Sequence, residues 1–166
     1  MSERLSILTV RFRENPSPIL RQTEPVLVWA TAPAAKPKAL LWGTLGDYRP
    51  EPPSHDPLLY RVEKTSKKAN AFGVGITLGR TQNNDLAVDD STVSRFHAYF
   101  QKDQKTGVWH VVDAESHNGT FCDGNRLVPR RPAPLHDGVA LRFGYVEMRF
   151  LLPEGFAAFM REHTAL

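Results

Sequence analysis

The sequence contains almost no cysteine and no long hydrophobic run, and both absences limit the kinds of protein to which it can belong. Cys122 is the single cysteine in 166 residues, which excludes an internal disulfide framework and a thiolate zinc cluster. No apolar stretch approaches the roughly 20 residues that a transmembrane helix needs. Residues 1–5 lack the basic and apolar segments of a secretory signal. We therefore expect a soluble protein of the reducing cytoplasm, without a membrane partner.

An excess of charge of one sign is missing as well. The chain has 21 Lys and Arg against 18 Asp and Glu, a formal net charge of +3, which does not by itself indicate nucleic-acid binding. The sequence has two short basic runs that contain no aromatic residues for base stacking. One is Lys64 with Lys67 and Lys68, and the other is Arg130 with Arg131. We interpret both runs as solvated faces and expect no nucleic-acid partner.

Patterns typical of metal sites and hydrolases are also absent. The six histidines show neither His-x-His nor His-x-x-x-His spacing. Ser94, His97 and Asp113 include the residue types of a hydrolase triad, but Ser94 lacks a Gly-x-Ser-x-Gly elbow and would share one turn with His97. We therefore expect a protein that is not an enzyme and holds no metal ion or other cofactor.

Proline is concentrated near the start of the chain. Nine of the 13 prolines fall within residues 1–57, which are predicted to form a Pro-rich, partly ordered N-terminal extension. Such a region is expected to hold no long helix and no central strand. The apolar segments 5–12 and 25–30 are predicted as short strands, and 50–57 as an extended linker or covering loop. Added strands, an irregular cover and a self-association surface all stay open for the extension.

Short apolar runs alternate with turn residues over residues 58–152. Nine or ten such runs can be counted, about 8–12 residues apart, and Asp123-Gly124 predicts a hairpin between two of them. This pattern favours an all-β, antiparallel β-sandwich. Residues 153–166 instead predict a short amphipathic C-terminal helix and tail, with Pro153 at its start. We interpret that helix as a cap on the open end of the sandwich; a partner-binding helix is the alternative.

Three loop clusters between the predicted strands carry side chains suited to an anion and a peptide. Loops at one end of a sandwich converge while the strands hold them rigid. Arg80 and Arg95 offer planar, permanently charged donors for a phosphate, and Ser94 offers a hydroxyl. Asn118 has both an amide donor and an acceptor, which suits the main chain of an extended peptide. Together they are what a phosphopeptide-binding protein requires.

The ordered motifs of these loops resemble the forkhead-associated (FHA) domain. The resemblance covers roughly residues 58–152, and its most specific part is the succession of Gly-Arg, Ser-x-x-His and Ser-x-Asn-Gly-Thr. It implies an FHA-type sandwich that binds phosphothreonine peptides through loops at one end. The motifs in this sequence are Leu78-Gly79-Arg80, Asn84-Asp85, Val93-Ser94-Arg95-Phe96-His97-Ala98 and Ser116-His117-Asn118-Gly119-Thr120.

Matched by position, the resemblance assigns a role to each binding residue. Arg80 would contact the phosphate and the nearby peptide backbone, and Ser94 would donate its hydroxyl to the phosphate. Arg95 occupies the next phosphate-side position, with an outward-pointing side chain as the alternative. Asn118 would bind the peptide main chain just after the phosphothreonine. His117 occupies a pocket position where the family often has Ser, Thr or Arg, and both a pocket wall and an exposed loop residue stay open for it. The matching structural positions are Gly79, His97 and Gly119, and His97 would brace the loop that carries Ser94.

The function implied is that of a signalling adaptor that binds a phosphothreonine-containing partner. The alternative is a phosphate-independent interaction or scaffold domain that acts through the extension, the sheet surface or the last helix. We expect the residues that select the peptide sequence in the turns around 103–105 and 123–126. The partner and the oligomeric state are left open.

Overall fold

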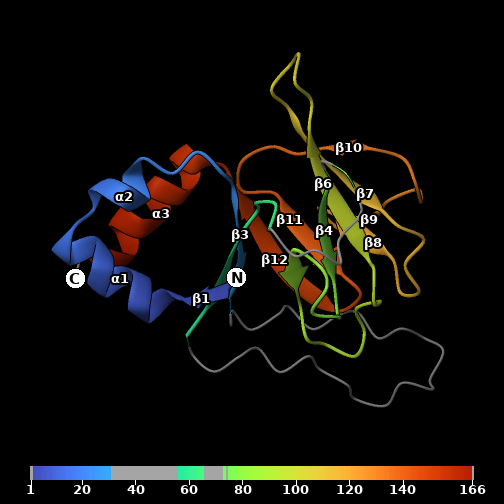
Figure 1. Ribbon diagram of the computed structural model, residues 1–166, viewed down its shortest axis with the longest axis horizontal. Coiled ribbons are helices and arrows are strands. Elements are labelled where there is room, and N and C mark those ends of the chain that lie inside the picture. The colour runs from blue at the N-terminus through green and yellow to red at the C-terminus, as the bar shows by residue number, and fades with distance from the viewer. Residues whose placement is uncertain (1, 31–55, 66–72, 74, 166) are drawn as a thin grey trace.

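Two β-sheets pack face to face in the computed structural model, which describes residues 2–30, 56–65, 73 and 75–165 (Figure 1). The strands are β1 (Ser2–Arg4), β2 (Val26–Trp29), β3 (Leu58–Arg61), β4 (Ile76–Gly79), β5 (Leu86–Ala87), β6 (Ala98–Lys102), β7 (Trp109–Asp113), β8 (Thr120–Cys122), β9 (Asn125–Arg126), β10 (Ala133–Pro134), β11 (Ala140–Phe143) and β12 (Val146–Leu151). The helices are α1 (Leu5–Glu14), α2 (Ser17–Leu20) and α3 (Pro153–Thr164).

The sheets confirm the predicted all-β sandwich. One sheet has seven strands in the order β1-β3-β2-β12-β11-β8-β9, and the other has five in the order β10-β7-β6-β4-β5. Every strand pair is antiparallel except β4 with β5. The hairpin predicted at Asp123-Gly124 is confirmed, since β8 pairs with β9 across these residues.

Aromatic side chains join the two sheets in the core. The ring of Phe100, on β6, lies with its centroid 6.2 Å from that of Phe143, on β11, and 6.2 Å from that of Phe150, on β12. All three side chains are fully buried. Because they come from opposite sheets, their burial fixes the spacing of the strands that lead into the loops.

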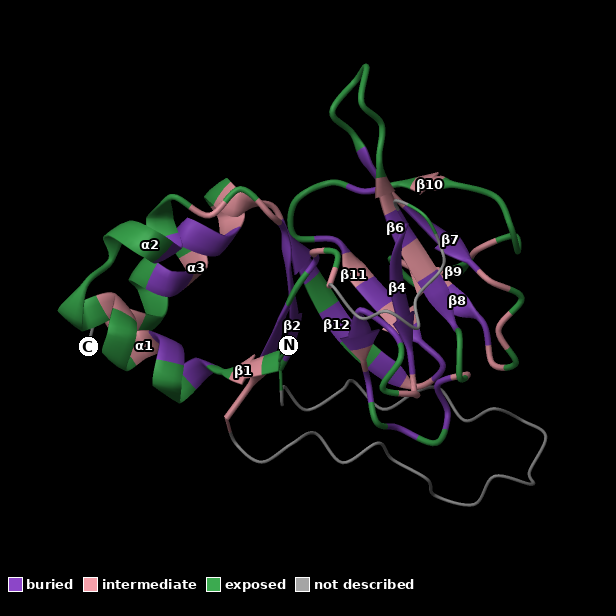
Figure 2. Ribbon diagram, viewed as in Figure 1, coloured by how far each residue is buried: buried purple, intermediate pink, exposed green. Residues whose placement is uncertain are grey.

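A second apolar cluster covers the outer face of the seven-stranded sheet. Leu27 and Trp29 of β2 point into the sandwich, whereas Val26 and Val28 point away from it and pack with residues of the three helices. Figure 2 shows the buried residues on both sheets and on parts of α1 and α3. None of the helices in the described part of the chain is both long enough and apolar enough to span a bilayer.

The strand predicted at 5–12 is wrong, because this segment forms α1. Its buried or half-buried apolar residues are Leu5, Leu8 and Phe12, which recur every three or four positions and so share one helix face. The expectation that the extension lacks a central strand is also wrong, since β2 lies between β3 and β12. Pro25 stands just before β2 and Pro16 just after α1, so these prolines bound the elements and do not interrupt them.

The predicted C-terminal helix is confirmed as α3, but its expected position is not. Its buried Phe156 and Met160 pack with α1, α2 and the outer sheet face, and not on an open end of the sandwich. The division into 1–57, 58–152 and 153–166 stays a prediction, although the seven-stranded sheet itself contains strands from both sides of residue 57. The predicted linker at 50–57, except its last two residues, lies outside the described residues, as do Lys67 and Lys68.

Candidate functional site

The three predicted loop clusters meet at one end of the sandwich (Figure 1). Ser94 is the point at which they join. Its carbonyl oxygen accepts a hydrogen bond from the Arg80 backbone N–H at 2.9 Å, and its Oγ accepts one from the His117 backbone N–H at 3.0 Å. One serine thus ties together the loop after β4, the loop before β6 and the loop before β8.

The side chains predicted to bind lie around this junction. Arg80, Ser94 and Asn118 are half-buried, and Arg95 and His117 are exposed. The Arg80 guanidinium donates to the Ser91 carbonyl oxygen at 3.4 Å, which is a long and therefore weak hydrogen bond. The side chain of His117 is exposed, and its backbone N–H faces Ser94.

Asn118 is held by the loop that carries Ser94. Its Nδ2 donates to the Thr92 carbonyl oxygen at 2.9 Å. Thr92 is in turn fixed by Asp90, whose Oδ1 accepts from the Thr92 backbone N–H at 2.8 Å and from its hydroxyl at 2.6 Å. The sequence analysis missed Thr92, although the Asp-x-Thr spacing is a turn signal that would have found it.

His97 braces the two loops from within. It is fully buried, its Nδ1 accepts the Ser94 backbone N–H at 3.0 Å, and its Nε2 lies 3.1 Å from the Gly119 carbonyl oxygen. This pattern requires a neutral ring with the proton on Nε2. Burial lowers the pKa of His97, which favours that neutral form.

Two glycines are required by close packing. A Cβ added to Gly79 would lie 2.2 Å from the Arg95 carbonyl oxygen and 2.7 Å from Asn84 Nδ2. Asn84 itself donates to the Arg95 carbonyl oxygen at 2.7 Å and so holds the Arg95 backbone against β4. Gly119 has φ +86°, in the left-handed region, and the Arg126 side chain packs directly on it.

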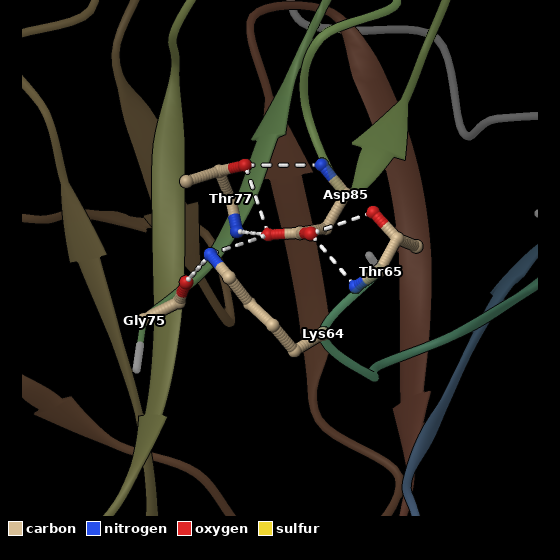
Figure 3. A network of polar contacts seen from close by, with 5 residues as sticks. All are labelled: Lys64, Thr65, Gly75, Thr77 and Asp85. Carbon is tan, nitrogen blue, oxygen red and sulfur yellow. Dashed lines mark hydrogen bonds and ion pairs between the residues drawn. The ribbon is translucent and has the colours of Figure 1, made fainter. Parts of the chain in front are cut away.

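Asp85 anchors the base of the site from the other side of β4 (Figure 3). Its carboxylate accepts hydrogen bonds from the Thr77 backbone N–H at 2.9 Å, the Thr65 backbone N–H and hydroxyl at 2.8 Å, and Lys64 Nζ at 3.1 Å. Burial alone would raise the pKa of Asp85, but these donors outweigh it and lower the pKa to about 2. The anchor fixes β4 and the segment before it, and with them the turn that carries Arg80.

The residue types of a hydrolase triad are present but are not connected as a triad. The carboxylate of Asp113 accepts hydrogen bonds from the hydroxyls of Ser116 and Thr120, both at 2.5 Å. His97 contacts the Ser94 backbone N–H and not its hydroxyl. Asp113 therefore shapes the turn before β8. Among the described residues, no three His, Cys, Asp or Glu side chains gather to hold a metal ion.

The two turns expected to select the peptide sequence differ in position. The turn at 103–105 lies between β6 and β7 and projects from the end of the sandwich opposite the three loops (Figure 1). That expectation is therefore wrong, since β6 leads away from His97. Arg126, in the other turn region, lies against Gly119 and so borders the site.

Comparison with known proteins matches the same region of the chain. The FHA domain family model matches residues 76–144. Oxoglutarate dehydrogenase inhibitor of Corynebacterium efficiens is 37% identical over 75 residues, which are 45% of this chain and 49% of that protein. The protein of the same name from Corynebacterium glutamicum is 36% identical with the same coverage. The chain thus spans about half the length of the curated relatives it matches.

Several solved structures are also similar to this chain. Mycobacterium tuberculosis EmbR, in complex with a low-affinity phosphopeptide, is 27% identical over 47% of this chain and 20% of its own, with a TM-score of 0.42. The N-terminal FHA domain of Rad53p from S. cerevisiae, in complex with a phosphothreonine peptide, is 20% identical over 51% of this chain and 73% of its own, with a TM-score of 0.45. Residues 76–144 of this chain are therefore similar to the FHA domain.

Proposed function

We propose that the chain is a phosphothreonine-peptide recognition module that acts as a signalling adaptor. The single observation that carries the proposal is the position of Ser94, which hydrogen-bonds both to the Arg80 loop and to the His117 loop. The donors suited to a phosphate and the amide suited to a peptide are thereby held side by side by hydrogen bonds within the protein. A preformed site of this kind loses little freedom when it binds.

Each side chain has a defined task in this proposal. Arg80 and Arg95 pair with the phosphate oxygens, which carry about −1.5 to −2 charges at neutral pH. The Ser94 oxygen already accepts the His117 N–H, so its hydroxyl hydrogen is directed to the phosphate. The Nδ2 of Asn118 is engaged by the Thr92 carbonyl, and in the described part of the chain its Oδ1 accepts no hydrogen bond. That oxygen accepts a main-chain N–H of the peptide.

The test is binding of a phosphothreonine peptide library, with phosphoserine and unphosphorylated libraries as ligand controls. We expect low-micromolar phosphothreonine binding, about −8 kcal/mol, because such interfaces are small and the peptide is ordered on binding. Arg80→Ala should weaken binding by about 2–5 kcal/mol, the loss typical of a paired charge at an interface. Arg149→Ala removes the same charge from the exposed outer face of β12 and should leave binding unchanged. Unaltered affinity in Arg80→Ala would refute the assigned pocket.

A phosphate-independent interaction is the alternative function. The matching relatives are named as inhibitors of oxoglutarate dehydrogenase, so that enzyme belongs among the unphosphorylated partners to be assayed. Binding that persists in Arg80→Ala and without phosphate would favour this alternative. We further propose that the chain acts by binding and not by catalysis, and that it does so in the cytoplasm.

A further inference from the structure

The three helices cover only one side of the outer face of the seven-stranded sheet (Figure 1). The sheet residues beneath them come from β3, β2 and the last position of β12, and they are Leu59, Val26, Val28 and Leu151. The rest of β12, followed by β11 and β8, forms the other side of this face, next to the edge strand β9. None of its outward side chains belongs to the apolar cluster beneath the helices. We call this second side the open sheet face.

The side chains of the open sheet face alternate with those of the core. Leu141 on β11 and Met148 on β12 point into the sandwich, and so do the residues two positions after each of them. The positions between therefore point outwards. The pairing of β8 with β11 adds Phe121 to the same side. The outward side chains, of which the last two are exposed and the others half-buried, are Phe121, Ala140, Arg142, Glu147 and Arg149.

Positive charge predominates on the open sheet face. Its one carboxylate, that of Glu147, stands opposite Arg142 in register. In the described part of the chain, however, neither Arg142 nor Arg149 forms an ion pair. Arg126 adds a further positive charge on β9, whereas the carboxylate of Asp123 already accepts a hydrogen bond from a backbone N–H of β11 at 3.1 Å. The face therefore attracts an acidic partner and repels a second copy of itself.

An aromatic ring holds Arg142 in place on this face. The guanidinium lies 3.6 Å from the centre of the Phe121 ring, and its Nη1 donates to the Gly144 carbonyl oxygen at 2.6 Å. A guanidinium has several further N–H donors, and these stay available to a carboxylate. Aromatic residues and arginine are the types enriched at protein interfaces. Phe121 and Arg142 thus form a preorganised platform for a partner.

The width of the open sheet face matches one helix. Neighbouring strands lie about 4.8 Å apart, so the sheet from β12 through β11 and β8 to β9 is about 14 Å wide. An α-helix with its side chains is about 10–12 Å across. On the other side of the sheet, α1, α2 and α3 already pack in the same way. A further helix on the open sheet face would continue that layer.

We propose that the open sheet face binds an acidic amphipathic helix of a partner protein. Carboxylates of the helix pair with Arg149 and with the available donors of Arg142, and an apolar side chain between them packs on Phe121 and Ala140. The surface is formed by strands and not by the three loops assigned to the phosphopeptide. The inference therefore goes beyond the proposed function and does not depend on it.

The probe is an unphosphorylated, covalently stapled helical peptide with a stripe of leucines flanked by glutamates. The full chain is titrated with it by fluorescence anisotropy, and the same peptide with glutamine for glutamate is the ligand control. The glutamate peptide should bind about tenfold more tightly, because each of two partly exposed ion pairs contributes about threefold to fivefold. Arg149→Glu should weaken it about tenfold. Arg131→Glu reverses the same charge on an exposed residue between β9 and β10 and should leave it unchanged.

The position of the bound helix is measured by NMR. Amide shifts should change on β8, β11 and β12, and equally so in Arg80→Ala. Shift changes confined to other strands would overturn the inference. A spectrum of Arg149→Glu that matches wild type away from β12 confirms that the folded protein is compared, since this side chain is exposed.

Four further results would overturn the inference. The first two are equal binding of the glutamine peptide and undiminished binding by Arg149→Glu. The third is equal binding of an acidic peptide kept from forming a helix by prolines, which would assign the face to an extended acidic segment. The fourth is a dimer in solution that Arg149→Glu dissociates, which would assign it to a second copy. The phosphothreonine library tests the proposed function separately, since Arg149→Glu should bind its peptides as wild type does.

Discussion

Replacing Asp85 with asparagine tests whether the anchor beneath the loops is ionic. The side chain of Asp85 is fully buried, and its carboxylate accepts hydrogen bonds from Thr77, Thr65 and Lys64 (Figure 3). Asparagine keeps the shape but turns one oxygen into an NH2 group that faces donors. The lysine then loses its counter-charge, although its Nζ still donates to the Gly75 carbonyl oxygen at 2.7 Å.

The size of the effect follows from the ionisation of Asp85. Its pKa is about 2 in the folded protein against an ordinary value of 3.8. Since a tenfold difference in proton affinity is worth about 1.4 kcal/mol, the ionised form stabilises the fold by about 2 kcal/mol at neutral pH. Misdirected donors in the variant add to this loss, and removing one member of a buried pair typically costs about 3–5 kcal/mol. We expect a loss of about 3 kcal/mol, a melting temperature lower by about 6–12 °C.

The sign of the pH dependence is also fixed. Because the folded pKa is lowered, the stabilisation is complete above the unfolded value of 3.8 and is lost as pH falls towards 2. About half of it should be gone near pH 3. Urea unfolding of wild type and Asp85→Asn across this range measures the difference, which should shrink with acid. Asp89→Asn makes the same change on an exposed residue and should alter stability by less than about 0.5 kcal/mol.

Two results would refute this reasoning. The first is a loss in Asp85→Asn of less than about 1 kcal/mol, within the range of ordinary surface changes. The second is a difference between wild type and variant that stays constant from neutral pH down to about pH 3. Either would mean that the carboxylate is not held as an anion by its donors.

Two further predictions concern the loops themselves. Gly79→Ala must displace the Arg95 carbonyl, 2.2 Å from the new Cβ, so phosphothreonine-peptide affinity should fall at least about tenfold by fluorescence titration. Gly107→Ala is the control: its new Cβ meets no atom within 4 Å, and the variant should bind normally. Because the pKa of His97 is lowered in the folded protein, the fold is stabilised only while the ring is neutral. This stabilisation is complete above the ordinary pKa of 6.5 and is lost as pH falls through the folded pKa. Urea unfolding between about pH 7.5 and 5 should show this loss in wild type and not in His97→Gln; equal slopes would disprove it.

The strands and loops of the FHA region could be predicted because their signals are local. Turn residues flank each strand. Asp123 and Gly124 both have positive φ, a conformation that an Asp-Gly pair tolerates better than most residue pairs, and they therefore form the hairpin turn. The convergence of the three loops was expected from the sandwich, but the hydrogen bonds by which Ser94 joins them were not predicted, because no single segment of the sequence encodes contacts between loops. No local pattern pairs the His117 N–H with the Ser94 oxygen.

The N-terminal part was predicted poorly for two reasons. Helical spacing of Leu5, Leu8 and Phe12 was outweighed by the β-like run of neighbouring apolar residues. The prolines were read as breaking the region, whereas Pro25 sits just before β2, where its missing N–H is harmless. The place of β2 in the sheet depends on β12, more than a hundred residues away, which no local pattern contains.

The pairing of β2 with β12 has a consequence for how the protein reaches its fold. Val28 stands opposite Arg149, so β2 finds this partner only after more than a hundred further residues have been synthesised. Pairings of such long range raise the contact order and slow folding, because the intervening chain must lose its freedom first. Until β12 arrives, β2 has one unpaired edge, an exposed template for association with other chains. The sandwich should therefore form late and in one cooperative step, with the N-terminal strand as part of its folding unit.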